Sequence, residues 1–265
     1  MTSENGREEV LVATDGRTKI VTLNRPETRN ALTKPVLERV TAAIDEAASD
    51  EAIRCVVLTG AGGHFCSGAD IRSTMASDPD FFDHLEAYMD VFHGVIRALV
   101  RCPKPTIAAL DGCAVGFGAD MALACDLRVA ATTAYLQEKF VDIGLMPDGG
   151  GTFWLPRLIG TARAMKAILL SDKLTAKDLE ALGLLADCVP PEELTSATMA
   201  LARRLEKGPP LAFMEAKRAV YANLGDLEAA LRREREGQLR LLRSQDVIEG
   251  VMAWAQKRPP EFKGR

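Results

Sequence analysis

PTIAALDGCAVGFGADMALACDLRVAA, residues 105–131, decides the fold class of this chain. Its first part, TIAALDG (106–112), is an apolar run that ends in glycine, which predicts a buried strand. A glycine-rich loop follows. ADMALAC (119–125) then predicts a buried helix, and LRVAA (127–131) predicts a second strand. A strand, a loop, a helix and a strand in this order indicate an α/β fold with parallel pairing of the strands.

The segments before this stretch continue the alternation of strands and helices. Hydrophobic periodicity predicts strands at 10–14, 19–23 and 55–60 and helices at 34–49 and 81–102. After about residue 161 the chain is mostly helical in its pattern. Proline pairs at 190–191 and 209–210 indicate a boundary. We therefore expect a core at 1–190, which holds the ligand site, and a helical region at 191–265 for oligomerisation and for covering the ligand.

Composition excludes several classes of function. The formal net charge of −4 and the pI of about 5.6 argue against nucleic-acid binding. No apolar run reaches 18 residues, so we expect no membrane span, and the N-terminus lacks an apolar signal core. The six cysteines form no regular framework, which favours reduced thiols and a cytoplasmic protein. The three histidines do not have the spacing of metal ligands, so the sequence does not favour a zinc site.

Two glycine-rich loops are the first candidates for chemistry. HFCSGAD (64–70) and AVGFGAD (114–120) each follow a buried strand, where open α/β sheets bind ligands. Two backbone N–H groups that converge on one oxygen would form an oxyanion hole. Loops of this kind are also common as plain connections, so the pattern alone leaves both interpretations open. Ser67 as a nucleophile is a third interpretation, but no histidine is placed in the sequence as its base.

Longer motifs resemble the enoyl-CoA hydratase/isomerase family, the crotonase superfamily. They lie in the family's order and spacing: LNRPETRNAL (23–32), VVLTGAGGHFCSGADI (56–71), 105–131, GLMPDGGGTFWLPRLIG (144–160) and QKRPPEFKGR (256–265). The resemblance implies a crotonase-like spiral of ββα units, with a helical C-terminal region that forms a homotrimer or a dimer of trimers. It also implies an acyl-CoA thioester as the partner, with coenzyme A as part of the substrate and no separate cofactor.

The same resemblance implies roles for particular residues. The oxyanion hole would be the backbone N–H groups of Ser67 and Phe117, although the family usually has Gly or Ala at the second position. Residues expected along coenzyme A are Arg29, Ala31, Ala69 and Ile71, together with Lys257 and Phe262 from the C-terminus, the last two across a subunit interface.

The acidic residues favour one branch of the family. The resemblance implies that hydratases of the family use two glutamates, and the residues of this chain at the positions of those glutamates are Asp120 and Phe140. A phenyl ring neither orients nor deprotonates water. Asp148 matches the single acid of the isomerase branches, including ring-opening isomerases of aromatic acyl-CoA compounds. We therefore predict a double-bond shift with Asp148 as acid and base, Asp120 as a second catalytic acid, and Phe140 and Met146 in the acyl pocket.

Alternatives remain at this stage. One alternative is a 2-enoyl-CoA hydratase that uses Asp120, with or without Glu138, and another is a non-catalytic acyl-CoA-binding protein. Asp148 could instead cap a helix that begins near Gly150 or form an Asx-turn. Strand alternation around residue 140 favours solvated or salt-bridged side chains for Glu138 and Asp142.

Overall fold

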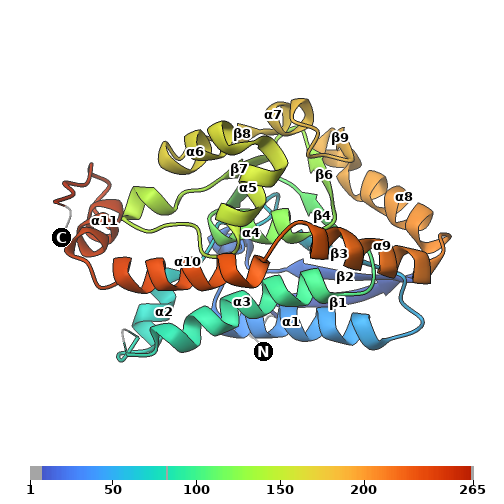
Figure 1. The fold of residues 1–265 in the computed structure, drawn as a ribbon, viewed down its shortest axis with the longest axis horizontal. Helices are drawn as coiled ribbons and strands as arrows, with labels where there is room; N and C mark the ends of the chain where they lie inside the picture. Colours follow the sequence, from blue (N-terminus) through green and yellow to red (C-terminus); the bar gives the residue numbers. More distant parts are fainter. Residues whose placement is uncertain (1–7, 82, 264–265) are drawn as a thin grey trace.

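The main sheet of the protein has six strands and begins with a hairpin (Figure 1). The computed structural model describes residues 8–81 and 83–263. The strands stand in the order β1 (Val10–Asp15), β2 (Thr18–Leu23), β3 (Cys55–Gly60), β4 (Thr106–Leu110), β6 (Leu127–Ala131) and β9 (Asp187–Val189). Within this sheet β1 and β2 pair antiparallel, and each neighbouring pair from β2 to β9 is parallel. A smaller sheet contains β5 (Cys113–Val115), β7 (Tyr135–Gln137) and β8 (Leu174–Thr175).

Helices follow the strands and then form the whole C-terminal part. In chain order they are α1 (Lys34–Ser49), α2 (Ile71–Ser77), α3 (Leu85–Arg101), α4 (Phe117–Ala124), α5 (Gly151–Ile159), α6 (Thr161–Leu169), α7 (Ala176–Ala181), α8 (Leu194–Glu206), α9 (Pro210–Asn223), α10 (Leu227–Leu241) and α11 (Gln245–Ala255). Short 3-10 helices lie at η1 (Pro26–Thr28), η2 (Phe140–Ile143) and η3 (Pro191–Glu193). No helix in the described ranges is long and apolar enough to cross a bilayer.

The central strands β3, β4 and β6 of the main sheet are buried on both faces, which explains their continuous apolar runs. Alternate residues of β3 point to opposite faces. Val56 and Leu58 join the core that contains α1 and α3, whereas Cys55 and Val57 pack in a second core with Leu194 and other residues of α8. The C-terminal helix α8 therefore covers the second face of the sheet.

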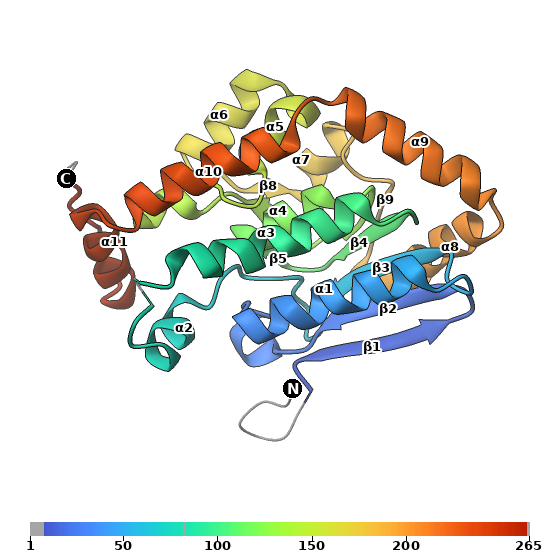
Figure 2. The same ribbon diagram turned by 60° about the horizontal axis from the view of Figure 1, so that its bottom comes forward.

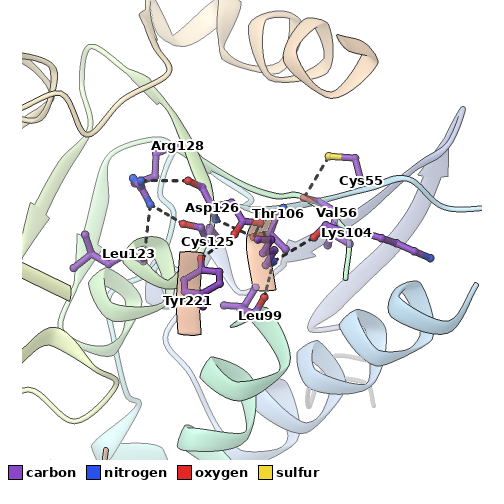
Figure 3. A network of polar contacts seen from close by, with 11 residues as sticks. Cys55, Val56, Leu99, Lys104, Thr106, Leu123, Cys125, Asp126, Arg128 and Tyr221 are labelled. Atoms are coloured by element: carbon purple, nitrogen blue, oxygen red, sulfur yellow. Dashed lines mark hydrogen bonds and ion pairs between the residues drawn. The ribbon is translucent and has the colours of Figure 1, made fainter. Parts of the chain in front are cut away.

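A buried ion pair attaches α9 to the sheet. Lys217 on α9 donates from Nζ to Asp126 Oδ2 at 2.8 Å, and Tyr221 donates to Asp126 Oδ1 at 2.8 Å. Figure 3 shows that Asp126 also binds Thr106 at the start of β4, through the backbone N–H and the hydroxyl. One carboxylate thus joins α9, β4 and the turn before β6. Beyond α9, α10 runs alongside α3 (Figures 1 and 2), where Arg97 pairs with Glu228 at 3.0 Å.

Lys217→Met is expected to lower the free energy of unfolding by about 3 kcal/mol, because it leaves a mostly buried carboxylate without its cation. The side chains of Lys217 and Asp126 are only 9% and 19% exposed. Thermal unfolding followed by circular dichroism measures the effect. Arg218→Met is the matched control, because the neighbouring Arg218 pairs with Glu215 on the surface and is expected to change stability little. Equal melting temperatures for the wild type and Lys217→Met would contradict this role.

The helices and strands predicted from the sequence agree with those of the structure over most of the chain. The helix at 34–49 and the strands at 55–60 and 127–131 have the predicted bounds. The helix predicted from residue 81 begins only at Leu85, because the Asp78 side chain holds the backbone N–H of Asp80 and the ring of His84 in a turn before it. All six cysteines are free thiols. The boundary near residue 190 stays a prediction, and the N-terminal stretch 1–7 lies outside the described residues.

Candidate active site

The loop 144–150, between η2 and α5, places Asp148 in the interior, with 8% of its surface exposed. Gly150 precedes α5 with φ of +96°, a conformation that favours glycine. The N-cap residue of α5 is Gly150, and neither oxygen of Asp148 accepts from the first turn of the helix, so the interpretation of Asp148 as a helix cap is wrong. Its carboxylate instead accepts a hydrogen bond from Gln238 Nε2 at Oδ2, 2.8 Å away. Oδ1 is buried without a hydrogen-bond partner in the described structure. One oxygen is therefore fixed and the other is free.

Side chains from three helices hold this loop. His93 on α3 lies 2.9 Å from the carbonyl oxygen of Asp148. Since a carbonyl only accepts, the His93 Nε2 carries the proton. Asp120 on α4 accepts from Gly149 N at 2.8 Å. Glu234 on α10 accepts from Gly150 N at 2.7 Å, from the N–H of the first turn of α5 at 2.9 Å, and from the adjacent threonine hydroxyl. The position of Asp148 is thus determined by contacts to its own carbonyl and to the residues that follow it.

The pKa of Asp148 is raised to about 7: burial is the main cause, the hydrogen bond from Gln238 acts against it, and the nearby Glu234 carboxylate adds to it. A group with this pKa is both protonated and ionised in comparable amounts at neutral pH. That is the property a general base needs when it must also return the proton as an acid. Burial lowers the pKa of His93 to about 4, so His93 is neutral there and acts as a fixed donor.

A second pair of acids lies beside this loop. Asp120 and Glu138 are 0% and 1% exposed, and neither oxygen of Glu138 has a partner among the described residues. A Cβ built on Gly151 would stand 2.6 Å from Asp120 Oδ1 and 3.1 Å from Glu138 Oε1, so the two carboxyls face the same point. Burial and the neighbouring carboxylates raise the pKa of both groups. The expectation of a solvated or salt-bridged Glu138 is wrong, whereas Asp142 does pair with Lys139 at 3.1 Å.

Glu138→Gln is expected to make protein stability less sensitive to rising pH. Because the folded-state pKa of Glu138 is raised, the native state keeps a proton that the unfolded chain releases. Stability therefore falls as pH rises from the ordinary carboxyl range toward the raised pKa, by up to about 1.4 kcal/mol per pH unit for one proton. Glutamine needs no proton and can donate to Asp120. Urea unfolding at pH 6 and pH 8 measures both slopes, and equal slopes would contradict the retained proton.

The two glycine-rich loops meet as predicted. Of the two backbone N–H groups predicted to form the oxyanion hole, that of Ser67 is wrong. The Ser67 N–H already donates to the Arg29 carbonyl at 2.9 Å. Ala69 pairs with Leu32 in a parallel bridge, in which the hydrogen bonds are made by its two neighbours. Among the described residues, no acceptor is found for the N–H of Ala69 or of Phe117. Each loop therefore has a backbone N–H without an acceptor in the described structure, that of Ala69 in the first loop and that of Phe117 in the second.

The bulky side chain at residue 117 fits because it turns into the core. Phe117 is 1% exposed and packs edge-on against Phe92 of α3, with ring centroids 4.7 Å apart. Its backbone N–H stays at the loop. The ring of Phe140 lies 3.8 Å from the position of a Cβ on Gly116, and it is 8% exposed. An apolar ring therefore lies next to the Phe117 amide, where the predicted hydratase would need a carboxylate.

The residues predicted to lie along coenzyme A fall in two places. Arg29 is exposed with φ of +54°, and Ala31 is buried with its carbonyl bound by Arg25 at 2.6 Å. Lys257 lines a surface hollow with Arg72, next to Ile71, and with Trp254 and Arg258. This hollow brings the helix that begins at Ile71 next to the C-terminal segment of the same chain, and the contact of Lys257 and Phe262 with coenzyme A across a subunit interface stays a prediction.

The C-terminal tail is folded rather than frayed over its described part. Arg258 pairs with Glu249 of α11 at 2.6 Å, and the backbone N–H groups of Glu261 and Lys263 bind the side chains of Glu249 and Asp246 at 2.8 and 2.7 Å. These contacts hold Phe262, which is 43% exposed, on the surface next to α11. The last two residues of the predicted motif, 264–265, lie outside the described residues.

A comparison with family models matches residues 16–265 to the model described as enoyl-CoA hydratase/isomerase. The chain belongs to the enoyl-CoA hydratase/isomerase family. A probable enoyl-CoA hydratase of Rhodobacter capsulatus is 40% identical over 247 residues, which cover 93% of this chain and 94% of the relative. The 1,2-epoxyphenylacetyl-CoA isomerase of Escherichia coli is 36% identical, with 92% of this chain and 94% of the relative covered. A solved enoyl-CoA hydratase of Mycobacterium avium subsp. paratuberculosis matches with a TM-score of 0.88 and 35% identity over 97% of this chain and 99% of that chain.

Membership of the enoyl-CoA hydratase/isomerase family makes this protein an enzyme of acyl-CoA thioesters with the crotonase fold. The names of the relatives include hydratases and an isomerase, so the family alone does not select the reaction. Within the described residues, no group of three or more His, Cys, Asp or Glu side chains is arranged to hold a metal ion.

The sequence did not indicate three residues of this site: His93, Glu234 and Gln238. His93 and Glu234 contact the backbone of the loop, and Gln238 contacts both its backbone and Asp148. The available signal was weak. Glu234 and Gln238 are spaced one helical turn apart, which places them on one face of α10, but their segment is rich in charged residues and resembles a solvated helix.

Proposed function

We propose that this enzyme shifts the double bond of an enoyl-CoA thioester and that Asp148 carries the proton. The observation that supports this proposal most strongly is the state of the Asp148 carboxyl. One oxygen is bound by Gln238, the other has no hydrogen-bond partner, and the pKa is about 7. Phe140 supports the same conclusion, since the position where related hydratases are expected to have a second carboxylate holds an apolar ring.

The proposed reaction begins with a 3-enoyl thioester. Ionised Asp148 removes a proton from C2, and the electrons of the C–H bond move to the thioester oxygen to give a dienolate. The N–H groups of Ala69 and Phe117 would stabilise that oxygen, a contribution typically worth about 10²–10³ in rate for one donor. The protonated Asp148 then returns the proton to C4, and the double bond ends between C2 and C3. Proton and electrons balance without a second acid.

The apolar side chains near the loop support isomerisation over hydration. Phe140 and Met146 are proposed to line the acyl pocket and to keep water from the dienolate. The relative from Escherichia coli acts on an epoxyphenylacetyl-CoA by name. Ring opening of an aromatic acyl-CoA derivative is therefore a candidate for the physiological reaction of this enzyme, because it also needs a proton shuttle at an acyl-CoA thioester.

Hydration of a 2-enoyl-CoA is the second candidate. It is favoured by the hydratase names among the relatives and by the pair of carboxyls at Asp120 and Glu138. Both carboxyls are fully enclosed, and Asp120 holds the Gly149 amide through one oxygen. Phe140 stands where the second glutamate of a two-glutamate hydratase is expected, and this favours isomerisation over hydration.

The test is spectrophotometric. Pure protein is mixed with a medium-chain 3-enoyl-CoA, and the ultraviolet absorbance of the conjugated 2-enoyl thioester is followed, with 2-enoyl-CoA in a parallel cuvette. Isomerisation predicts that absorbance appears with the first substrate and persists with the second. Loss of absorbance from 2-enoyl-CoA without isomerisation of the 3-enoyl compound would favour the hydratase and return Asp120 and Glu138 to the catalytic role.

We also propose that the protein assembles as a homotrimer or a dimer of trimers and works in the cytoplasm. Large apolar side chains are exposed on the C-terminal helices, including Leu211, Val220, Met252 and Trp254, at 48–72%. Such exposure on late helices supports an assembly surface. Sedimentation equilibrium of the purified chain tests the stoichiometry.

A further inference from the structure

We propose that Gln238 is a positioning residue for the double-bond shift: its side-chain amide orients the Asp148 carboxylate so that Oδ1 exchanges the proton with the substrate. This inference rests on the proposed function of Asp148. Gln238 is 2% exposed and lies on α10, outside the loops that carry Asp148 and the amides of Ala69 and Phe117.

The hydrogen bonds of Gln238 define which of its side-chain atoms faces Asp148. Its Oε1 accepts from the backbone N–H of Met146 at 3.2 Å. A backbone N–H can only donate, so the oxygen of the amide must face Met146 and the NH₂ group must face Asp148. The NH₂ group then donates to Asp148 Oδ2 at 2.8 Å. The two bonds fix the amide in one orientation, and the amide in turn occupies one oxygen of the catalytic carboxylate.

Helix α10 approaches the loop closely enough for this contact because its inner face carries a glycine. A Cβ on Gly237 would collide with the sulfur of Met146. One turn before Gln238, Glu234 binds the amides at the start of α5. Successive turns of α10 thus hold the loop before and after Asp148. This arrangement indicates positioning of the carboxylate rather than a chance contact.

The effect of Gln238 must be separated from that of the other groups around Asp148. Glu234 lies on α10, Asp120 on α4 and His93 on α3, and Glu138 follows β7. Asp120 and Glu234 accept hydrogen bonds from the loop backbone, and His93 donates to it. Gln238 is the side chain in the described structure that donates to the Asp148 carboxylate, and this bond favours its ionised form.

Two variants of the full-length enzyme test the inference in the 3-enoyl-CoA assay. Gln238→Glu keeps an acceptor for Met146 but, when ionised, has no donor for Asp148. Gln238→Leu removes both contacts. Glu236→Gln, on the exposed face of the same helix, is the matched control. For both test variants we expect kcat to fall roughly tenfold or more, with KM nearly unchanged. The acidic limb of the pH profile of kcat/KM should shift to higher pH by about one unit or more, and the shift should be largest in Gln238→Glu.

A purely structural role would reduce activity without moving the pH limb. The inference is overturned if the folded variants keep the wild-type limb near pH 7, even when kcat falls. If Gln238→Leu does not fold, Gln238→Glu decides alone, because it preserves the Met146 contact. A wild type without isomerase activity, or an Asp148→Asn variant with full activity, would overturn the proposed function itself. An unchanged limb in Gln238 variants of an enzyme that does depend on Asp148 would overturn only the role of Gln238.

Discussion

Asp148→Asn is expected to reduce kcat for the double-bond shift by roughly 10³-fold, within the range usual for loss of a general acid–base group. An amide cannot accept the C2 proton at neutral pH, and the described structure offers no other carboxylate with a free oxygen on this loop. Asparagine can still accept the hydrogen bond from Gln238 through its carbonyl oxygen, so the loop should keep its position. Affinity for the acyl-CoA, measured by titration calorimetry, should stay close to the wild-type value.

The matched control is Asp142→Asn, in the 3-10 helix that precedes the same loop. Asp142 pairs with Lys139 near the surface, where its side chain is 39% exposed. We expect activity close to that of the wild type. Wild-type turnover in Asp148→Asn, with the control also unchanged, would exclude Asp148 as the proton carrier.

Gly118→Ala is expected to reduce kcat by about 10²-fold, a loss comparable to that of one oxyanion-hole donor. A Cβ at residue 118 would stand 2.7 Å from Cys66 Cβ and 2.8 Å from the Cys66 carbonyl oxygen. The backbone and the buried side chain of Cys66 are close-packed, so they can move only at a cost in packing energy. The first glycine-rich loop must therefore move away from the second. That movement separates the amides of Ala69 and Phe117, which the proposed mechanism directs at one oxygen.

Gly94→Ala provides the control for a glycine-to-alanine change in a helix. Nothing lies within 4 Å of a Cβ at Gly94 on α3, so the variant should keep its activity, and its stability should be equal to that of the wild type or higher, because alanine favours a helix more than glycine does. Activity and melting temperature are measured for both variants. Full activity in a folded Gly118→Ala enzyme would show that the spacing of the two loops does not control the rate.

The parts of the fold that follow local patterns could be predicted from the sequence. The helix at 34–49 has a regular apolar face, and the strands at 55–60 and 127–131 are bounded runs of apolar residues. Asp148 could be placed because it lies within a long motif. Glu138 could not be placed. The alternation around residue 140 favoured a solvated or salt-bridged side chain, yet the chain folds Glu138 against Asp120, 18 positions earlier.

Long-range pairing explains the remaining errors. The choice between Ser67 and Ala69 depends on the bridge to Leu32, which turns alternate N–H groups in opposite directions. That register is a contact between Leu32 and Ala69, 37 positions apart, and no local pattern encodes it. Gln238 approaches Asp148 across 90 positions for the same reason. Tertiary packing decides which atoms remain free for chemistry.

The most direct test of Asp148 as the single proton carrier follows the transferred hydrogen. A 3-enoyl-CoA deuterated at C2 is converted by the wild-type enzyme in ordinary water, and the product is examined by NMR. A single enclosed carboxyl should deliver a substantial part of the deuterium from C2 to C4 of the 2-enoyl product. A product without deuterium at C4, or a hydrated product in place of the isomer, would contradict proton transfer by Asp148 alone.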